Sequence, residues 1–372
     1  MQRLFHSAPG ASELTEHPPD EVDAWVQDGG WIWLDVLAPT EAEVATIGER
    51  FGFDHLSLQD VLDVSHLPKL DEFDDYLFVV LHGVVTGEQR RLETSELDLF
   101  IGADFLVSFH RLPLPSIDWV AEKAGIFNHL VIRSPALAAA AIAEAGSRRF
   151  LPLLDALDDG IEELEDLSFV GDPSTLSLTH ALRRDVIVLR RIVGPQSEVL
   201  HQLSQTPTEL LNNEARRAFR DVYDNLFRVA RWLDASRALL SGVGETYRGV
   251  VAERTNEVMK ILTVLSAILL PLALVSGIWG MNFLNLPLAD RRWGFVTVIG
   301  IMVLIGVGLW LYFVRLGFVG GPKLRDLPRS IGLGLVQIGT APVRAVADAL
   351  TGGDRNLEEE SKRPDPAASG DG

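Results

Sequence analysis

The chain has 372 residues, with 52 Asp and Glu against 33 Lys and Arg, which gives a formal net charge of −19. This acidic balance argues against a nucleic-acid partner, because phosphate binding needs a basic surface, and it suits a protein that meets cations. The alternative is that the acidic residues only aid solubility, and composition alone does not decide between the two. The absence of cysteine excludes disulfides and thiolate metal sites.

The first third of the chain predicts a mixed α/β domain. We expect residues 1–25 to be a flexible N-terminus and residues 26–134 to form the domain. Residues 30–36, rich in Trp and Ile, are typical of a strand. Thr40 and Glu43 have the spacing of a capping box and predict the start of a helix.

Further elements of this domain follow closely along the chain. A short helix is expected over residues 55–62, and strands are expected over 76–85, 97–102 and 105–110. No long crossover separates the three strands, so we expect them to pair in antiparallel fashion.

Residues 135–206 predict an acidic helical hairpin of two adjacent antiparallel helices. Within it, residues 151–172 place apolar side chains at helical spacing and carboxylates on the opposite face, with no Lys or Arg. These carboxylates are Asp155, Asp158, Asp159, Glu162, Glu163, Glu165, Asp166 and Asp172. The face either binds divalent cations loosely or is an ordinary solvated surface.

Residues 207–280 predict one long stalk helix that continues into a first transmembrane helix. Apolar residues recur at alternating spacings of 3 and 4 from Leu211 to Leu269. The pattern survives Gly242, Gly244 and Gly249, so we expect the helix to be continuous. Such a stripe needs neighbours, which favours a bundle of several copies.

Two uncharged stretches, Ile261 to Trp279 and Trp293 to Val314, predict a transmembrane hairpin with an outer loop over 281–292 and a second transmembrane helix over 293–314. Each stretch is close to the length that crosses a hydrocarbon layer of about 30 Å. The alternative is a pair of buried helices in a large soluble domain, but such helices are usually shorter and rarely uncharged for so long.

Charge and the N-terminal sequence predict the orientation. The N-terminus lacks the apolar core of a signal peptide. Lys and Arg are concentrated just before the first span and just after the second, which favours cytoplasmic termini. We therefore expect a multi-pass protein of the plasma (inner) membrane, with both termini in the cytoplasm. Residues 315–372 are expected to be a cytoplasmic C-terminal extension, partly disordered.

The junction between the first span and the outer loop resembles the signature of the CorA family of magnesium channels. Gly280-Met281-Asn282 follows the span directly, and Thr255 to Lys260 (TNEVMK) and Pro271 precede it in the order and spacing of the family. Residues 68–81, 99–111, 182–200 and 219–225 also look like family segments. The resemblance covers roughly residues 30–318.

The resemblance implies a fold and a function. It implies an α+β cytoplasmic funnel domain and a long stalk helix that continues into a two-helix transmembrane hairpin, assembled as a homopentameric α-helical channel in the lipid bilayer. Five first spans would line the pore and five second spans would face lipid. The channel would take up Mg²⁺ by passive influx driven by the membrane potential, with Co²⁺ or Ni²⁺ as further cations. We find no Walker loop, nucleophile elbow, zinc motif or Rossmann fingerprint, so we expect no enzyme.

By the same resemblance, the outer mouth is formed by Gly280, Met281 and Asn282. Mg²⁺ holds its waters tightly, so an amide oxygen of Asn282 and the carbonyl of Gly280 would recognise the hydrated ion. The simpler interpretation of Asn282 is a helix C-cap, and both roles are compatible.

Deeper in the span, the resemblance assigns the hydrophobic constriction to Met259 and Leu262 and a polar ring to Asn256. Packing between helices is the alternative for these residues. Ala273 stands where many family members have Thr, which removes a ring of hydroxyls. The outer loop also differs from the usual acidic loop, because it has only Asp290 and adds two arginines.

The resemblance also implies regulation by intracellular Mg²⁺ at carboxylates between subunits. Asp221 matches a family position that shares a divalent cation with a neighbouring subunit, and Glu245 occupies another such position. Glu88 is a candidate for the partner carboxylate, which the motif itself does not identify. The alternative for Asp221 is an ordinary exposed acid of the stalk.

The sequence leaves two competing functions open. One is a Zn²⁺, Co²⁺ or Ni²⁺ transporter of the related ZntB branch, although scattered histidines without cysteine give no soft-ligand site. The other is a membrane-anchored scaffold that does not conduct.

Overall fold

The structure is a computed structural model. It describes residues 1–11, 13–27, 30–63, 67–86, 92–123, 131–281 and 293–318. The described chain forms two compact units. The first comprises Met1–Asp166 and Ser174–Val243, and the second comprises Leu167–Pro173 with the described residues from Gly244 onward.

A seven-stranded sheet is the centre of the first unit, with strand order β2-β1-β3-β7-β6-β5-β4. Its strands are β1 (Gln2–Ser7), β2 (Thr15–His17), β3 (Trp31–Leu37), β4 (Lys69–Glu72), β5 (Tyr76–Thr86), β6 (Leu92–Gly102) and β7 (Phe105–His110). The predicted antiparallel pairing of the last three strands is confirmed. The sheet is mixed because β3 and β7 run parallel, joined by the long connection that a parallel pair requires.

The expectation of a flexible N-terminus is wrong. β1 pairs with β3 along its whole length, from Gln2 opposite Val36 to Ser7 opposite Trp31. Leu4 and Phe5 are buried, and the terminal amine donates to the Leu37 carbonyl at 2.7 Å. The short apolar pair in this strand therefore contributes to the core, and the backbone hydrogen bonds hold the segment to the sheet.

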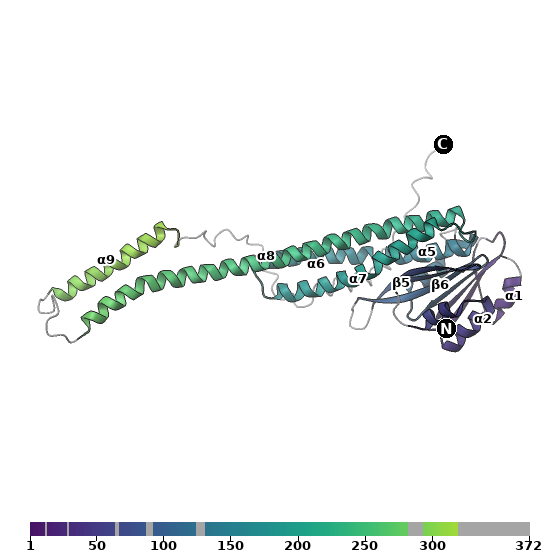
Figure 1. Cartoon of the computed structure of the whole chain (residues 1–372), viewed down its shortest axis with the longest axis horizontal. Helices are drawn as coiled ribbons and strands as arrows, with labels where there is room; N and C mark the ends of the chain where they lie inside the picture. Colours follow the sequence, from purple (N-terminus) through teal and green to yellow (C-terminus); the bar gives the residue numbers. More distant parts are fainter. Residues whose placement is uncertain are drawn as a thin grey trace, which may run out of the picture. The chain divides into compact units, whose positions relative to one another are not determined.

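Helices cover both faces of the sheet (Figure 1). On one face, α1 (Val22–Gln27), α2 (Glu41–Phe51) and α3 (His55–Leu62) enclose the main apolar core, which includes Phe53, Phe78 and Phe100. The predicted capping box at Thr40 and Glu43 is present at the start of α2. Against the other face lies α5 (Pro135–Arg148), whose alanines are almost all buried, with α4 (Pro115–Lys123) packed on it. Two short 3₁₀ turns, η1 (Pro19–Glu21) and η3 (Val131–Arg133), complete the domain.

Residues 135–206 contain three helices, so the prediction of a two-helix hairpin there is wrong. After α5, the chain turns at Arg149 and Phe150 and begins α6 (Leu151–Val170), followed by α7 (Ser174–Gln205). Pro152 lacks the amide that would continue α5 into α6, and it is well tolerated in the first turn of a new helix. The hairpin therefore consists of α6 and α7, and α5 belongs to the sheet.

The predicted continuous helix is present as α8 (Asn213–Trp279), and α9 (Gly294–Arg315) follows it. The start differs from the predicted residue 207 because Asn212 caps the helix, its side-chain oxygen accepting from the Ala215 amide at 2.7 Å. The most apolar windows of the two helices are only 6% and 11% buried. Core helices of a soluble domain would be mostly buried, so these apolar surfaces need cover from lipid or from other copies of the chain.

Candidate functional site

α8 and α9 contact each other within the second unit along one face of each helix. In this part of the chain Val264 of α8 and both Gly294 and Val298 of α9 are buried. Leu272 of α8 lies beside Gly306 of α9, 3.8 Å from the place of a Cβ atom there. The partly buried residues of the α8 span recur at spacings of 3 and 4, as one face of a helix does. They are Ala267, Ile268, Pro271, Leu272, Val275 and Trp279.

The residues predicted to line a pore lie on the opposite face of α8. At 3.6 residues per turn, the five predicted residues fall within an arc of roughly 120°. Met259, Leu262, Ala273 and Gly280 lie across the helix from the face that α9 covers, and Asn256 lies at the edge of the arc, roughly 20° from the direction of Ala267. All five are exposed, Met259 by 59% and Leu262 by 61%. The structure therefore brings the predicted residues onto one free helix face.

The same face has polar and small residues that the sequence analysis did not single out. Thr263, Ser266 and Gly277 share the arc, and each is exposed. Thr263 satisfies its hydroxyl within the helix by donating to the Met259 carbonyl at 2.7 Å. The spacing of positions 256, 259, 263 and 266 is the signal that identifies them.

The end of the first span is described as far as Met281. α8 ends at Trp279, and the Gly280 amide still donates to the Ser276 carbonyl at 2.9 Å. Met281 is exposed, and its amide donates to the Ile278 carbonyl at 3.3 Å. Asn282 lies outside the described residues.

The predicted regulatory carboxylates are not brought together within one chain. Asp221 and Glu245 are both exposed on α8, roughly seven turns apart, and Glu88 lies outside the described residues. Among the residues that the structure describes, no three or more His, Cys, Asp or Glu side chains are grouped to hold a metal ion. A shared ion at either position would need ligands from a second copy.

The acidic face of α6 is partly engaged with α8. Burial raises the pKa of Asp158, against a hydrogen bond from Trp232 that lowers it, and the neighbouring Asp155 and Asp159 raise it further. A second link joins the hairpin to α8, because Arg190 of α7 holds Asp234 through two hydrogen bonds, at 2.7 and 3.3 Å. This ion pair lowers the pKa of Asp234. The hairpin is thus fixed to the stalk by side chains.

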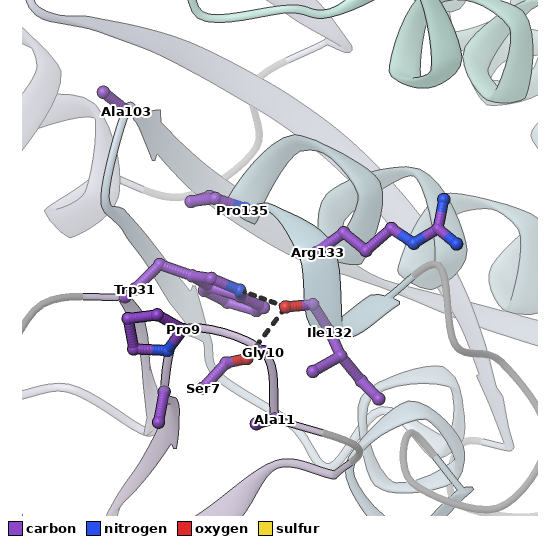
Figure 2. Close-up of a pocket in the computed structure, with 11 residues that line it drawn as sticks. Ser7, Pro9, Gly10, Ala11, Trp31, Ala103, Ile132, Arg133 and Pro135 are labelled. Carbon is purple, nitrogen blue, oxygen red and sulfur yellow. Dashed lines mark hydrogen bonds between the residues drawn. The ribbon is translucent and has the colours of Figure 1, made fainter.

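A cavity of about 570 Å³ lies in the first unit, where β1 ends and β3 begins (Figure 2). Ser7 and the indole of Trp31 both donate to the Ile132 carbonyl, at 2.8 and 2.6 Å. Arg133 is its charged lining residue and is paired with Glu214 at 3.2 Å. The hydrogen bonds and the ion pair thus provide partners for these polar groups within the first unit. None of the residues belongs to the α8 face described above.

An α/β domain with a mixed sheet, a long stalk helix and two apolar helices with little burial defines a two-span membrane protein. Known proteins agree with this class. The family model described as CorA-like Mg²⁺ transporter protein matches residues 28–315. The chain therefore belongs to the CorA-like family, and it is a divalent metal ion transporter rather than an enzyme.

Individual relatives and one solved structure are similar over most of their length. The cobalt/magnesium transport protein CorA of Thermotoga maritima is 31% identical over 76% of this chain and 82% of its own length. The zinc transport protein ZntB of Pectobacterium atrosepticum is 28% identical over the same shares, 76% and 82%. The structure of the CorA magnesium transporter from Methanocaldococcus jannaschii has a TM-score of 0.74 and 23% identity, covering 86% of this chain and 99% of that one, and it bears out the fold.

Proposed function

We propose that this protein is a Mg²⁺ uptake channel whose pore is formed by the free face of α8 in a homopentamer. The observation that carries the proposal is the position of Met259, Leu262, Ala273 and Gly280 across the helix from α9, with Asn256 at the edge of the same free face. A hairpin arranged in this way offers one face of α8 to other copies while α9 lies on the outside. The relative named as a cobalt/magnesium transport protein supports the choice of ion.

Composition of the two helix faces fits this arrangement. The free face of α8 includes Thr263, Ser266 and Gly277, and small and hydroxyl residues are typical of helix contacts and of polar paths within membranes. The exposed face of α9 is rich in large apolar residues such as Val303, Leu304 and Leu311, which suit lipid. Met259 and Leu262 would form the constriction that closes by excluding water.

Entry and driving force follow from the chemistry of the ion. A ring of Asn282 amides at the outer mouth, with carbonyls of Gly280, would hold hydrated Mg²⁺ through its waters, without the tight binding that a carboxylate ring would cause. A divalent cation that crosses the whole membrane field gains about 4.6 kcal/mol per 100 mV. Influx therefore needs no other energy source. Co²⁺ and Ni²⁺ are further cations of suitable charge.

Regulation would come from Mg²⁺ bound between subunits on the cytoplasmic side. Asp221 and Glu245 are exposed on the stalk, where a neighbouring copy can approach. Bound Mg²⁺ would cancel the repulsion between carboxylates and stabilise the closed bundle, with Glu88 as the partner ligand of Asp221. This arrangement needs both termini in the cytoplasm and the hairpin in the plasma (inner) membrane.

Zn²⁺ transport is the second candidate, favoured by the likeness to a zinc transport protein. Both candidates are tested by ion flux into liposomes that contain the purified full chain, with Mg²⁺ and Zn²⁺ compared at equal concentration. We expect Mg²⁺ influx that depends on an inside-negative potential, and a loss of about tenfold or more in Asn282→Ala, because each subunit then lacks one hydrogen bond to the hydrated ion. Influx of Zn²⁺ alone would support the zinc transporter.

A non-conducting scaffold makes the opposite prediction. Without a pore, the chain carries no ion, and a charged substitution such as Leu262→Lys changes no cation uptake in cells. In the proposed channel the same substitution places a ring of positive charge at the constriction and abolishes Mg²⁺ influx.

A further inference from the structure

The tip of the α6–α7 hairpin, residues 167–173, packs on α8 just before the first span. α6 ends at Val170, and Gly171 takes the left-handed conformation with φ +68°. The amide of Asp172 donates to the Leu167 carbonyl and that of Gly171 to the Ser168 carbonyl, both at 3.1 Å. This closure is the glycine-based ending of many helices, and it directs the last carbonyls of α6 outward.

Arg254 of α8 contacts this tip directly. Its guanidinium Nη2 donates to the carbonyl of Val170, one of the orphan acceptors at the end of α6. A Cβ atom added to Gly171 would lie 3.0 Å from Arg254 Nη1 and 3.1 Å from Val250 Cγ1. Two features therefore require glycine at position 171: the positive backbone angle and the close approach of α8.

The tip also belongs to the same compact unit as the transmembrane helices. α6 passes from the first unit to the second between Asp166 and Leu167, and Ser168 is buried within the second unit. Arg254 lies on the same turn of α8 as Asn256 and fewer than two turns before Met259. A contact at Arg254 can therefore fix the start of the proposed pore face.

We propose that Arg254 is a positioning residue for transport, which holds the hairpin tip against α8 and so stabilises the closed arrangement of the Asn256–Met259 turn. This inference rests on the proposed channel function. A contact that is made in the closed form and weakened in the open form adds its free energy to closure. Its loss shifts the equilibrium towards the open form at any given Mg²⁺ concentration.

The test compares Arg254→Met with Arg248→Met, which removes the same charge from an exposed position on the same helix. Mg²⁺ flux through the full chain in liposomes is measured against Mg²⁺ on the cytoplasmic side. We expect half-closure at a concentration about fivefold higher or more in Arg254→Met, the smallest coupling usual between two sites, and no change in Arg248→Met. Arg254→Lys, which keeps a donor for the Val170 carbonyl, should recover part of the shift.

A second pair of variants and a second readout keep the test independent of Arg254 itself. Gly171→Ala should raise the half-closure concentration in the same direction, whereas Gly317→Ala, at φ +74° with nothing near its Cβ position, has the same backbone strain without the contact and should not. Hydrogen exchange of the Gly171 and Asp172 amides should be faster in Arg254→Met. The inference would be overturned if neither variant shifted the half-closure concentration, and also if Arg254→Met and Arg248→Met shifted it equally. Absence of flux in the wild type would contradict the channel itself instead.

Discussion

His110 Nε2 lies 3.1 Å from Asp35 Oδ1 in the interior of the sheet, and both side chains are only 4% exposed. The second ring nitrogen, Nδ1, is 2.7 Å from the Leu112 carbonyl. Both nitrogens therefore face acceptors, which is the pattern of a doubly protonated imidazolium. Ser108 donates to the same Asp35 oxygen at 2.5 Å, and Trp33 donates to Ser108 at 3.0 Å. This network joins β3 to β7, the parallel pair of the sheet.

The His110–Asp35 pair predicts that stability falls at alkaline pH. Burial opposes the charged ring, but the hydrogen bond and charge of Asp35 and the Leu112 carbonyl outweigh it and raise the pKa of His110 above its ordinary 6.5. A raised pKa in the folded state contributes stability that is complete below pH 6.5 and is lost as the pH rises through the folded-state value. Thermal unfolding of the full chain in detergent, followed by tryptophan fluorescence, should show this decline in the wild type and not in His110→Gln.

Removal of one partner of the His110–Asp35 pair should lower the stability of the folded chain. Asp35→Ala leaves a buried imidazolium without its counter-charge, and we expect a loss of about 3–5 kcal/mol in the free energy of unfolding. Chemical denaturation of the variant measures it. A loss below about 1 kcal/mol would contradict the assignment of His110 as charged.

Much of this fold could be predicted from local patterns. The helix over residues 55–62 and the strand over 105–110 have the predicted bounds, because caps, turns and apolar periods are local signals. β1 could not be predicted in this way, because its pairing with β3 depends on a partner far along the chain that no local pattern contains. β6 begins at Leu92, earlier than the predicted residue 97.

The candidate site could be predicted in part for a similar reason. Asn256, Met259 and Leu262 follow from the family motif, and the structure adds that they share a face. Ser266 matches no residue of the motif; its spacing from Asn256 and Met259 places it on their face, and the structure shows that this face is exposed. The proposed pairing of Asp221 with a second copy would depend on contacts outside one chain, so neither the sequence nor a single chain determines it.

The proposed regulatory role of Asp221 and Glu245 predicts that their substitution lowers the sensitivity of the channel to Mg²⁺. Asp221→Asn and Glu245→Gln each remove a charge that bound Mg²⁺ would neutralise. Closure of these variants should therefore need a Mg²⁺ concentration about fivefold higher or more than closure of the wild type. Asp224→Asn is the matched control, because Asp224 is exposed on the same helix one turn from Asp221. Flux in liposomes against cytoplasmic Mg²⁺ distinguishes them, and an equal shift in Asp224→Asn would mean that only overall charge matters.

The proposed hydrophobic constriction predicts a channel that closes poorly when Leu262 becomes polar. Leu262→Ser should maintain Mg²⁺ flux at Mg²⁺ concentrations that close the wild-type channel. The hydroxyl binds water, so the constriction excludes water less readily. Leu304→Ser, on the exposed face of α9, introduces the same change towards lipid and should leave closure unchanged. Closure of Leu262→Ser at the wild-type concentration would contradict a gate at this position.

The most direct measurement uses the absence of cysteine from the natural chain. Ser266→Cys places a thiol on the free face of α8, and Ile268→Cys places one on the face that α9 covers. A charged, membrane-impermeant thiol reagent is added during Mg²⁺ flux into liposomes. A water-filled path along the free face predicts that the reagent blocks flux through Ser266→Cys and leaves the wild type and Ile268→Cys unchanged. Full flux through treated Ser266→Cys, or equal block of Ile268→Cys, would contradict a pore on this face.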